Sequence, residues 1–330
     1  MSNKITSFQL CSLMLINDVF VLFCLGGGIS AATAAGFGIG SILQLIIAIP
    51  LIIMYKNRGT LEYCGKIGEI LLLAGVILWG GTLFSMLMRA GNLVFVPFES
   101  FGKLGNIITT VLIAIVCVYI SSSGIRAMSR SAVIAAALGV VCLAVVVVSA
   151  IFHGDAENIT TVESTGFFSE LAKGFGLSGG LAGFTVMLGF VKDNIPRTAI
   201  GYFIGKAVIA SVILITGVFV CGGIMEITEF PIVSAAQLTQ PFSVQRIDSL
   251  FLIVFTVFAV YSIAVQASAA EYLTGEIFPF IKRYRCSAAL GIMAVLGAIW
   301  GSSGMITAVA ATGGMIIIPI IYFIKRKMRV

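Results

Sequence analysis

Two apolar stretches of the sequence, residues 8–34 and 167–191, are interrupted by glycines, and the first also carries a carboxylate, Asp18, near its middle. Hydrophobic segments that glycine breaks at corresponding positions of two halves are typical of transporter-type binding sites at the middle of a bilayer. A carboxylate at that depth is a candidate functional group, because placing a charge in hydrocarbon costs at least about 2.5 kcal/mol. These two stretches are therefore the first candidates for chemistry.

The interruption in the second stretch is a run with five glycines in ten residues, from Gly174 to Gly183. It predicts a broken helix whose free backbone groups face a ligand, because helix ends leave unpaired N–H and C=O groups. Ser178, Gly179 and Gly180 are the candidate ligand-binding residues. The alternative is close helix packing, since the run contains two overlapping GxxxG spacings.

The first stretch offers two break points. Asn17 and Asp18 mark one of them, and the run Gly26-Gly27-Gly28 marks the other. A break near residue 18 would let the Asp18 carboxylate meet a ligand ammonium, a proton or a cation, with Asn17 beside it. The alternative is a structural role, in which a buried neutral carboxylic acid donates a hydrogen bond to a neighbouring helix.

The composition indicates which elements position these groups. Hydrophobic residues make up 59% of the 330 residues, charged residues make up 10%, and the mean hydropathy is +1.12. Soluble domains carry about 25% charged residues, so the sequence predicts an integral membrane protein. A span needs about 20 apolar residues, and we count ten such ranges: 8–34, 38–55, 68–90, 104–121, 131–152, 167–191, 198–221, 249–273, 287–301 and 305–324.

The distribution of basic residues predicts the orientation of the protein in its membrane. With ten spans and a cytoplasmic N-terminus, 16 of the 20 lysines and arginines fall on the cytoplasmic side, and Lys206 is counted among them. This bias is what the positive-inside rule requires when both termini are cytoplasmic. The net charge of +6 therefore indicates orientation in the bilayer, and no nucleic-acid partner is expected.

The ten ranges divide into two blocks of nearly equal length, 8–152 and 167–324, joined by a polar segment. We expect one transmembrane domain over residues 1–330, with halves at about 1–155 and 160–330. Because five is odd, the second half enters the membrane inverted, as in many secondary transporters. The predicted fold is an all-α polytopic membrane protein with ten transmembrane helices in a 5+5 inverted repeat, in which helices one and six are broken.

Polar residues in the third and eighth spans are further ligand candidates, because these spans flank the broken helices in such a repeat. They are Thr82 and Ser85 in the third span and Tyr261 and Ser262 in the eighth, where Gln266 follows. The alternative is again structural, since hydroxyl and amide side chains in membrane helices often bond to neighbouring helices.

The sequence predicts no enzyme. The single histidine, His153, falls in an external connection, so neither a Ser-His-Asp arrangement nor a Cys/His metal set can be assembled. The seven cysteines are scattered without a CxxC pair and read as small apolar residues. We expect no metal and no cofactor, and the expected partners are a small-molecule ligand and the lipid bilayer.

Three segments carry a resemblance to a known family. The most specific is Phe230-Pro231-Ile232-Val233-Ser234-Ala235-Ala236-Gln237-Leu238, which leads to Arg246-Ile247-Asp248-Ser249-Leu250-Phe251. The others are Lys4-Ile5-Thr6-Ser7-Phe8-Gln9-Leu10 and Gly124-Ile125-Arg126-Ala127-Met128-Ser129-Arg130. Together they resemble the permease-like B subunits of bacterial spore germinant receptors, which belong to the amino acid-polyamine-organocation superfamily.

This resemblance implies a fold similar to the leucine transporter and a subunit that recognises a nutrient, often an amino acid such as alanine. It also implies A-type and C-type partner subunits and, in a host that sporulates, the spore inner membrane. The sequence departs from the family at two places. Asp18-Val19-Phe20-Val21-Leu22 stands where the family has a glycine-containing break and a proline, and Thr185 stands where it often has a glutamate.

The leading functional expectation is a membrane subunit of a germinant receptor that binds a small amino acid-like germinant. The first alternative is a secondary transporter of amino acids or amines that is coupled to protons through Asp18. The second alternative is a non-transporting assembly protein whose site has decayed.

Overall fold

The computed structural model describes residues 4–58, 65–94, 102–161, 166–176, 180–238, 248–278, 285–300 and 304–327. In these ranges the chain is helical, and the only extended pairing is a single parallel bridge between Ile5 and Val191. The helices are α1 (Ser7–Phe23), α2 (Ala31–Arg58), α3 (Gly65–Val94), α4 (Gly102–Ser122), α5 (Ile125–His153), α6 (Asn158–Thr161), α7 (Phe167–Gly176), α8 (Leu181–Leu188), α9 (Ile195–Cys221), α10 (Ile224–Ile227), α11 (Pro231–Leu238), α12 (Asp248–Ile277), α13 (Arg285–Trp300) and α14 (Gly304–Lys327).

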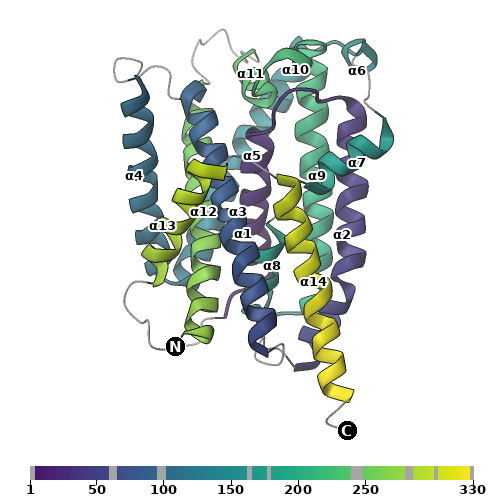
Figure 1. The fold of residues 1–330 in the computed structure, drawn as a ribbon. Coiled ribbons are helices and arrows are strands. Elements are labelled where there is room, and N and C mark those ends of the chain that lie inside the picture. The colour runs from purple at the N-terminus through teal and green to yellow at the C-terminus, as the bar shows by residue number, and fades with distance from the viewer. Residues whose placement is uncertain are drawn as a thin grey trace.

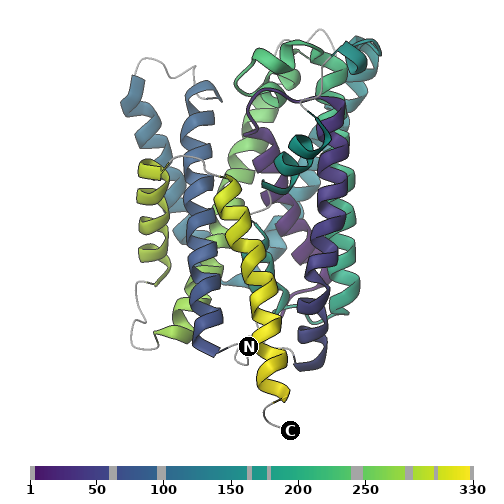
Figure 2. The same ribbon diagram turned by 45° about the vertical axis from the view of Figure 1, so that its right-hand side comes forward.

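The long helices stand side by side in one bundle, and both termini lie at the same end of it (Figure 1 and Figure 2). Among the described residues, five helices are long and apolar enough to cross a membrane. They are parts of α2, α3, α5, α9 and α12. Each of the ten predicted ranges contains at least one helix, so the prediction of an all-α protein with membrane-compatible helices is confirmed.

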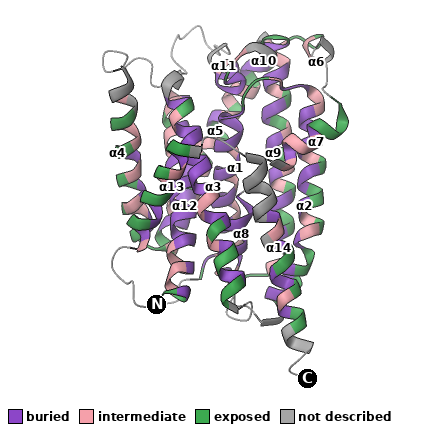
Figure 3. Cartoon of the chain, in the orientation of Figure 1, coloured by how far each residue is buried: buried purple, intermediate pink, exposed green. Residues whose placement is uncertain are grey.

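Exposed residues run along the outer helices of the bundle (Figure 3), and many of them are large and apolar. On α2, the exposed side chains Ile42, Ile46, Ile49 and Ile53 follow one another at intervals of three or four residues and form one face. Soluble proteins rarely leave such a continuous apolar face in contact with water. The exposed face therefore fits contact with lipid.

The first glycine-interrupted stretch differs from the prediction. Helix α1 is continuous through Asp18 and ends at Phe23, so the break point near residue 18 is wrong. Residues 24–30 are not helical, and α2 begins at Ala31, within the range predicted for the first span. Three consecutive glycines each cost about 1 kcal/mol in a helix, and Gly28 has a φ of 77°, which other residues rarely adopt. The glycines therefore connect two helices.

The second stretch is interrupted as predicted. Helix α7 ends at Gly176 and α8 begins at Leu181, with Gly180 as its N-terminal cap residue. All eight residues of α8 are buried, whereas α7 lies near the end of the bundle opposite the termini (Figure 1). The helix that the glycine run divides thus has one peripheral half and one central half.

The N-terminal end of α1 is fixed to the segment that follows α8. Thr6 and Gln9 form a capping box at the start of α1, and the Ser7 backbone N–H donates to Asp193 Oδ2 at 2.7 Å. Ile5 pairs with Phe190 and Lys192 through two backbone hydrogen bonds. These contacts hold α1 in register with the segment between α8 and α9, and α9 carries the residues that contact Asp18.

Candidate functional site

Asp18 lies within α1 with its side chain almost completely buried. The Tyr202 hydroxyl donates to Asp18 Oδ2 at 2.7 Å, and Lys206 Nζ lies 3.5 Å from Asp18 Oδ1. Both partners belong to α9, and because they are four residues apart they share one face of that helix. The carboxylate is therefore held by an ion pair and a short hydrogen bond between α1 and α9.

Lys206 does not lie at the cytoplasmic surface, where the sequence prediction placed it. Its side chain is 4% exposed, lies inside the bundle and also donates to Gln44 Oε1 of α2 at 3.3 Å. Counting it among the cytoplasmic basic residues was wrong, because its ammonium group faces Asp18 rather than the membrane surface. A buried ion pair needs close geometry and further hydrogen bonds to repay its desolvation, and Tyr202 and Gln44 supply them.

Little free space remains beside this pair. A cavity of about 10 Å³ is lined by Leu15, Asp18, Val19, Val21, Leu22, Phe37, Lys206, Ile209 and Ala210. A cavity needs about 10–15 Å³ to hold a single water molecule. The Lys206 ammonium thus occupies the side of Asp18 where the sequence hypothesis puts the ammonium of a ligand.

The polar groups next to Asp18 on the other side are bonded much less completely. Asn17 Nδ2 lies 3.5 Å from Asp18 Oδ1, and Gln266 Nε2 of α12 lies 3.5 Å from Asn17 Oδ1. Both distances exceed the usual range for N–H···O hydrogen bonds, about 2.7–3.2 Å. Gln266 Oε1 and the Trp79 Nε1 of α3 have no hydrogen-bond partner among the described residues, although both side chains are fully buried.

These under-bonded groups surround the first turn of α8. A Cβ atom added to Gly180 would lie 2.5 Å from Asn17 Nδ2 and 3.5 Å from Trp79 Nε1. A Cβ atom added to Gly183 would lie 2.6 Å from Gln266 Oε1. The glycines allow this close approach, so an unpaired donor and an unpaired acceptor both face the N-terminal end of α8, where backbone N–H groups favour an anionic ligand group.

The other predicted ligand residues lie in different surroundings. Thr82 and Ser262 are buried, and their hydroxyls donate to carbonyl groups of their own helices, at Leu78 and Phe258. Ser85 and Tyr261 are also buried. A Cβ atom on Gly297 of α13 would lie 3.0 Å from the Ser85 backbone nitrogen, so this turn of α3 packs on α13. Gly180 lies at the site, and Ser178 and Gly179 lie outside the described residues.

A second polar cluster joins the two interrupted stretches. Glu170 of α7 is 1% exposed and accepts a hydrogen bond from Thr33 Oγ1 of α2 at 2.6 Å. Lys173 Nζ donates to Glu170 Oε1 at 2.9 Å and to the Gly28 carbonyl at 3.0 Å. The peripheral half of the broken helix is thereby fastened to the connection between α1 and α2.

Sequence reasoning missed Lys206, Tyr202, Trp79 and Glu170 as members of these clusters. A signal was present for Lys206, which stands inside an apolar stretch and deserved the same reasoning as Asp18. Trp79 carried a weaker signal, because a buried indole N–H usually finds a partner. The pairing of Glu170 with Thr33 had no signal, since it depends on how α7 crosses α2.

These features define a class of protein: an all-α helical bundle with an apolar outer face and a buried polar centre. In the described ranges, no group of three or more His, Cys, Asp or Glu side chains could hold a metal ion. No protein-family model matches the chain, and no curated protein matches it either. The resemblance to germinant-receptor B subunits therefore stays a prediction from the sequence.

Proposed function

We propose that this protein binds a small zwitterionic molecule of the amino acid class at the centre of its helix bundle. The observation that carries the proposal is the pair of unpartnered polar atoms, Trp79 Nε1 and Gln266 Oε1, beside the first turn of α8. Leaving a buried polar atom unpaired costs about 1–3 kcal/mol. A ligand that supplies an acceptor to Trp79 and a donor to Gln266 removes both costs.

The chemistry of the surrounding groups favours a zwitterion. The indole N–H, the Asn17 Nδ2 group that faces Gly180 and the N-terminal end of α8 suit a carboxylate, whereas the Gln266 carbonyl oxygen suits an ammonium group. Asp18 is the nearest formal charge on α1, but Lys206 neutralises it. A ligand with no net charge therefore matches the electrostatics of the site.

We further propose that ten helices cross the bacterial cell membrane in a 5+5 inverted repeat of the leucine-transporter type, with both termini cytoplasmic. Support comes from the helix in each of the ten ranges, the broken helix at α7 and α8, and the two termini at one end of the bundle. Within this class, the sequence resemblance favours a germinant-receptor subunit that signals ligand binding to A-type and C-type subunits.

A proton-coupled transporter is the second candidate, and the buried Asp18–Lys206 pair favours it. Intramembrane carboxylates and lysines frequently form part of ion pathways. In this alternative, proton uptake by Asp18 would release Lys206 and loosen α1 from α9. The broken helix and the ligand site serve both candidates, so only the response to a proton gradient separates them.

The proposal is tested by the thermal stability of the purified protein in detergent with each of the twenty amino acids. A ligand at 100 times its Kd stabilises the folded state by about 2.7 kcal/mol, so at least one zwitterion should raise the Tm. If no amino acid shifts the Tm, the ligand proposal fails and the alternative of an assembly protein with a decayed site gains.

Uptake of the stabilising amino acid into proteoliposomes then separates the two candidates. A receptor subunit binds without accumulation, whereas a transporter accumulates the ligand when a proton gradient is applied. Accumulation that disappears in Asp18→Asn and remains in the matched variant Thr82→Val would favour the transporter and exclude a pure receptor. The folded state of Asp18→Asn must be verified, and the double variant Asp18→Asn/Lys206→Met, which leaves no buried charge unpaired, provides a second test.

A further inference from the structure

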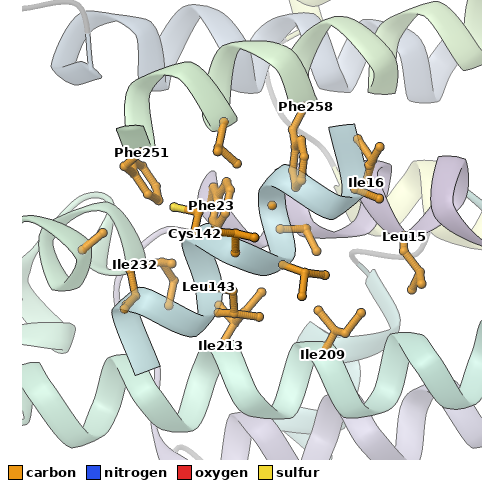
Figure 4. Close-up of a pocket in the computed structure, with 18 of the residues that line it drawn as sticks. Leu15, Ile16, Phe23, Cys142, Leu143, Ile209, Ile213, Ile232, Phe251 and Phe258 are labelled. Carbon is orange, nitrogen blue, oxygen red and sulfur yellow. The ribbon is translucent and has the colours of Figure 1, made fainter. Parts of the chain in front are cut away.

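A long apolar crevice lies between α1, α5, α9, α11 and α12 and is separate from the polar site. Its volume is about 530 Å³. Figure 4 shows side chains from these helices that point into it, among them Leu15, Phe23, Leu143, Ile213 and Phe258. None of its lining residues is charged, and Ser12 and Thr216 carry the only hydroxyl groups among them. The crevice therefore suits a hydrocarbon occupant.

The shape of the crevice is narrow and elongated. On α5 the lining residues run from Val133 to Val146, which corresponds to about 20 Å along the helix at 1.5 Å per residue. The volume of about 530 Å³ is the space open to the centre of a water molecule, so over that length the gap between the walls is about 9 Å, which is still narrower than a helix with its side chains, about 10–12 Å wide. A partner helix is therefore too thick to enter it.

A single acyl chain fits these dimensions. Non-bonded carbon atoms pack at about 3.5–4.0 Å, so a gap of about 9 Å admits a polymethylene chain whose carbons pack on the apolar walls. Water is a poor occupant, because a buried water needs two to four polar partners, and Ser12 and Thr216 carry the only hydroxyl groups in the lining.

Exposed residues of α5 form part of the rim of the crevice. Of the five candidate spans, the one in α5 has the smallest buried share, 22%. Val140 and Val141 on the crevice side of α5 are more than half exposed. In a membrane, this rim contacts lipid, which places acyl chains directly at the entrance.

We propose that this crevice is a binding site for one acyl chain of a membrane phospholipid. The chain gains van der Waals contacts with apolar walls on several sides, whereas an empty channel forfeits them. Leu15, Val19 and Ile209 line both the crevice and the small cavity beside Asp18 and Lys206. The bound chain therefore sets the spacing of α1 and α9 behind the ion pair, and this role does not depend on the ligand site.

Native mass spectrometry of the full chain, purified in mild detergent from a bacterial membrane, tests the proposal. We expect one phospholipid per protein to survive gentle activation. Ala136→Phe, which places a ring in the crevice, should lower lipid occupancy about tenfold, equivalent to about 1.4 kcal/mol of binding free energy. Ala144→Phe is the matched control, because Ala144 is exposed on α5 but does not line the crevice.

A phospholipid with a photoreactive diazirine in its acyl chain provides the second measurement, in vesicles of phosphatidylglycerol and phosphatidylethanolamine. Cross-links should concentrate on the lining segments of α5 and α9 and should fall in Ala136→Phe, or in Ala137→Phe at the rim if the first variant does not fold. Equal labelling of every exposed apolar face, or equal lipid retention in the lining and control variants, would overturn the proposal. A dimer cross-linked through α5 would also overturn it, because a second copy would then cover the crevice.

Discussion

Asp18 and Asn17 are adjacent on α1, yet the polar groups around them are bonded very differently. On the Asp18 side, Tyr202 donates at 2.7 Å and the Lys206 ammonium supplies the opposite charge. On the Asn17 side, the hydrogen bonds are 3.5 Å long, and Gln266 Oε1 has no partner in the described part of the chain. The first region is fully bonded within the protein, whereas the second leaves a buried polar atom unpaired.

The difference shows why a buried charge alone is a poor guide to a ligand site. A carboxylate in a membrane indicates function from the sequence because its desolvation is costly. Once the structure supplies a lysine and a tyrosine, that cost is met within the protein. The polar groups that still lack partners are neutral ones, and the ligand proposed above would bind there.

The largest expected effect comes from removing the carboxylate of the ion pair between Asp18 and Lys206. Asp18→Asn keeps the shape of the side chain and leaves the Lys206 ammonium without its carboxylate. Removing one partner of a buried ion pair typically costs about 3–5 kcal/mol. The free energy of unfolding in detergent should fall by this amount, measured by thermal or denaturant unfolding of the purified protein.

A double-mutant cycle separates the energy of the ion pair between Asp18 and Lys206 from the effects of each substitution on its surroundings. Asp18→Asn/Lys206→Met removes both charges and should recover most of the loss, since apolar replacement of a buried pair is often close to neutral. If Asp18→Asn costs less than about 1 kcal/mol, as an exposed ion pair would, the pair is not the structural contact described above.

Substitution of the unpaired polar groups beside Asn17 should change the affinity for the ligand rather than the stability of the fold. Gln266→Met conserves side-chain length and removes the unpaired acceptor, so stability should stay the same or rise. Affinity for the stabilising amino acid should fall about tenfold, which corresponds to the 1.4 kcal/mol that one such hydrogen bond provides. Titration of the Tm shift against ligand concentration measures both quantities.

Ser262→Ala is the matched control for this prediction, because Ser262 lies one turn earlier on α12 and its hydroxyl is satisfied by the Phe258 carbonyl. It should leave ligand affinity unchanged. An equal loss of affinity in both variants would contradict the distinction between paired and unpaired groups.

A smaller effect is expected where the broken helix crosses α2. A Cβ atom on Gly36 would lie 2.6 Å from the Glu170 carbonyl oxygen, and backbone cannot move aside as a side chain can. Gly36→Ala should destabilise the fold by about 1–3 kcal/mol, the usual cost of overpacking. Unfolding measurements on Gly201→Ala provide the control, because nothing lies within 4 Å of that position and the helix should gain about 0.5–1 kcal/mol.

The fold was predictable from the sequence to the extent that it follows from local composition. Apolar runs predict helices wherever they are long enough, and the glycine run from Gly174 to Gly183 predicts an interruption. Gly26 to Gly28 form the same kind of signal with a different outcome, since the chain turns there from α1 into α2. Sequence spacing alone does not say whether a glycine run divides one helix or joins two.

The site was predictable only in part, because satisfaction of polar groups is a property of three-dimensional packing. Asn17, Asp18 and Gly180 stand out in the sequence as polar or flexible residues in an apolar setting. Lys206 stands out equally, but its partner is 188 positions away in the chain. Whether Trp79 and Gln266 find partners depends on the crossing of α3, α8 and α12, which the sequence does not encode locally.

The smallest expected effect concerns the contact that holds α1 in register with α9 at the end of the bundle. The Ser7 backbone N–H donates to Asp193 and holds the pKa of this exposed carboxyl below its ordinary value of 3.8. Its contribution to stability is therefore fully present above that value and is lost as the pH falls through the lower folded pKa. Between about pH 5 and pH 3, the Tm of the wild-type protein should fall slightly more than that of Asp193→Asn, which cannot titrate at this position. Parallel curves for the two proteins would mean that the carboxylate does not fasten α1, whose N-terminal end would then be held by the Ile5 backbone pairing and by the hydrogen bond from the Thr198 hydroxyl to the Ser7 hydroxyl.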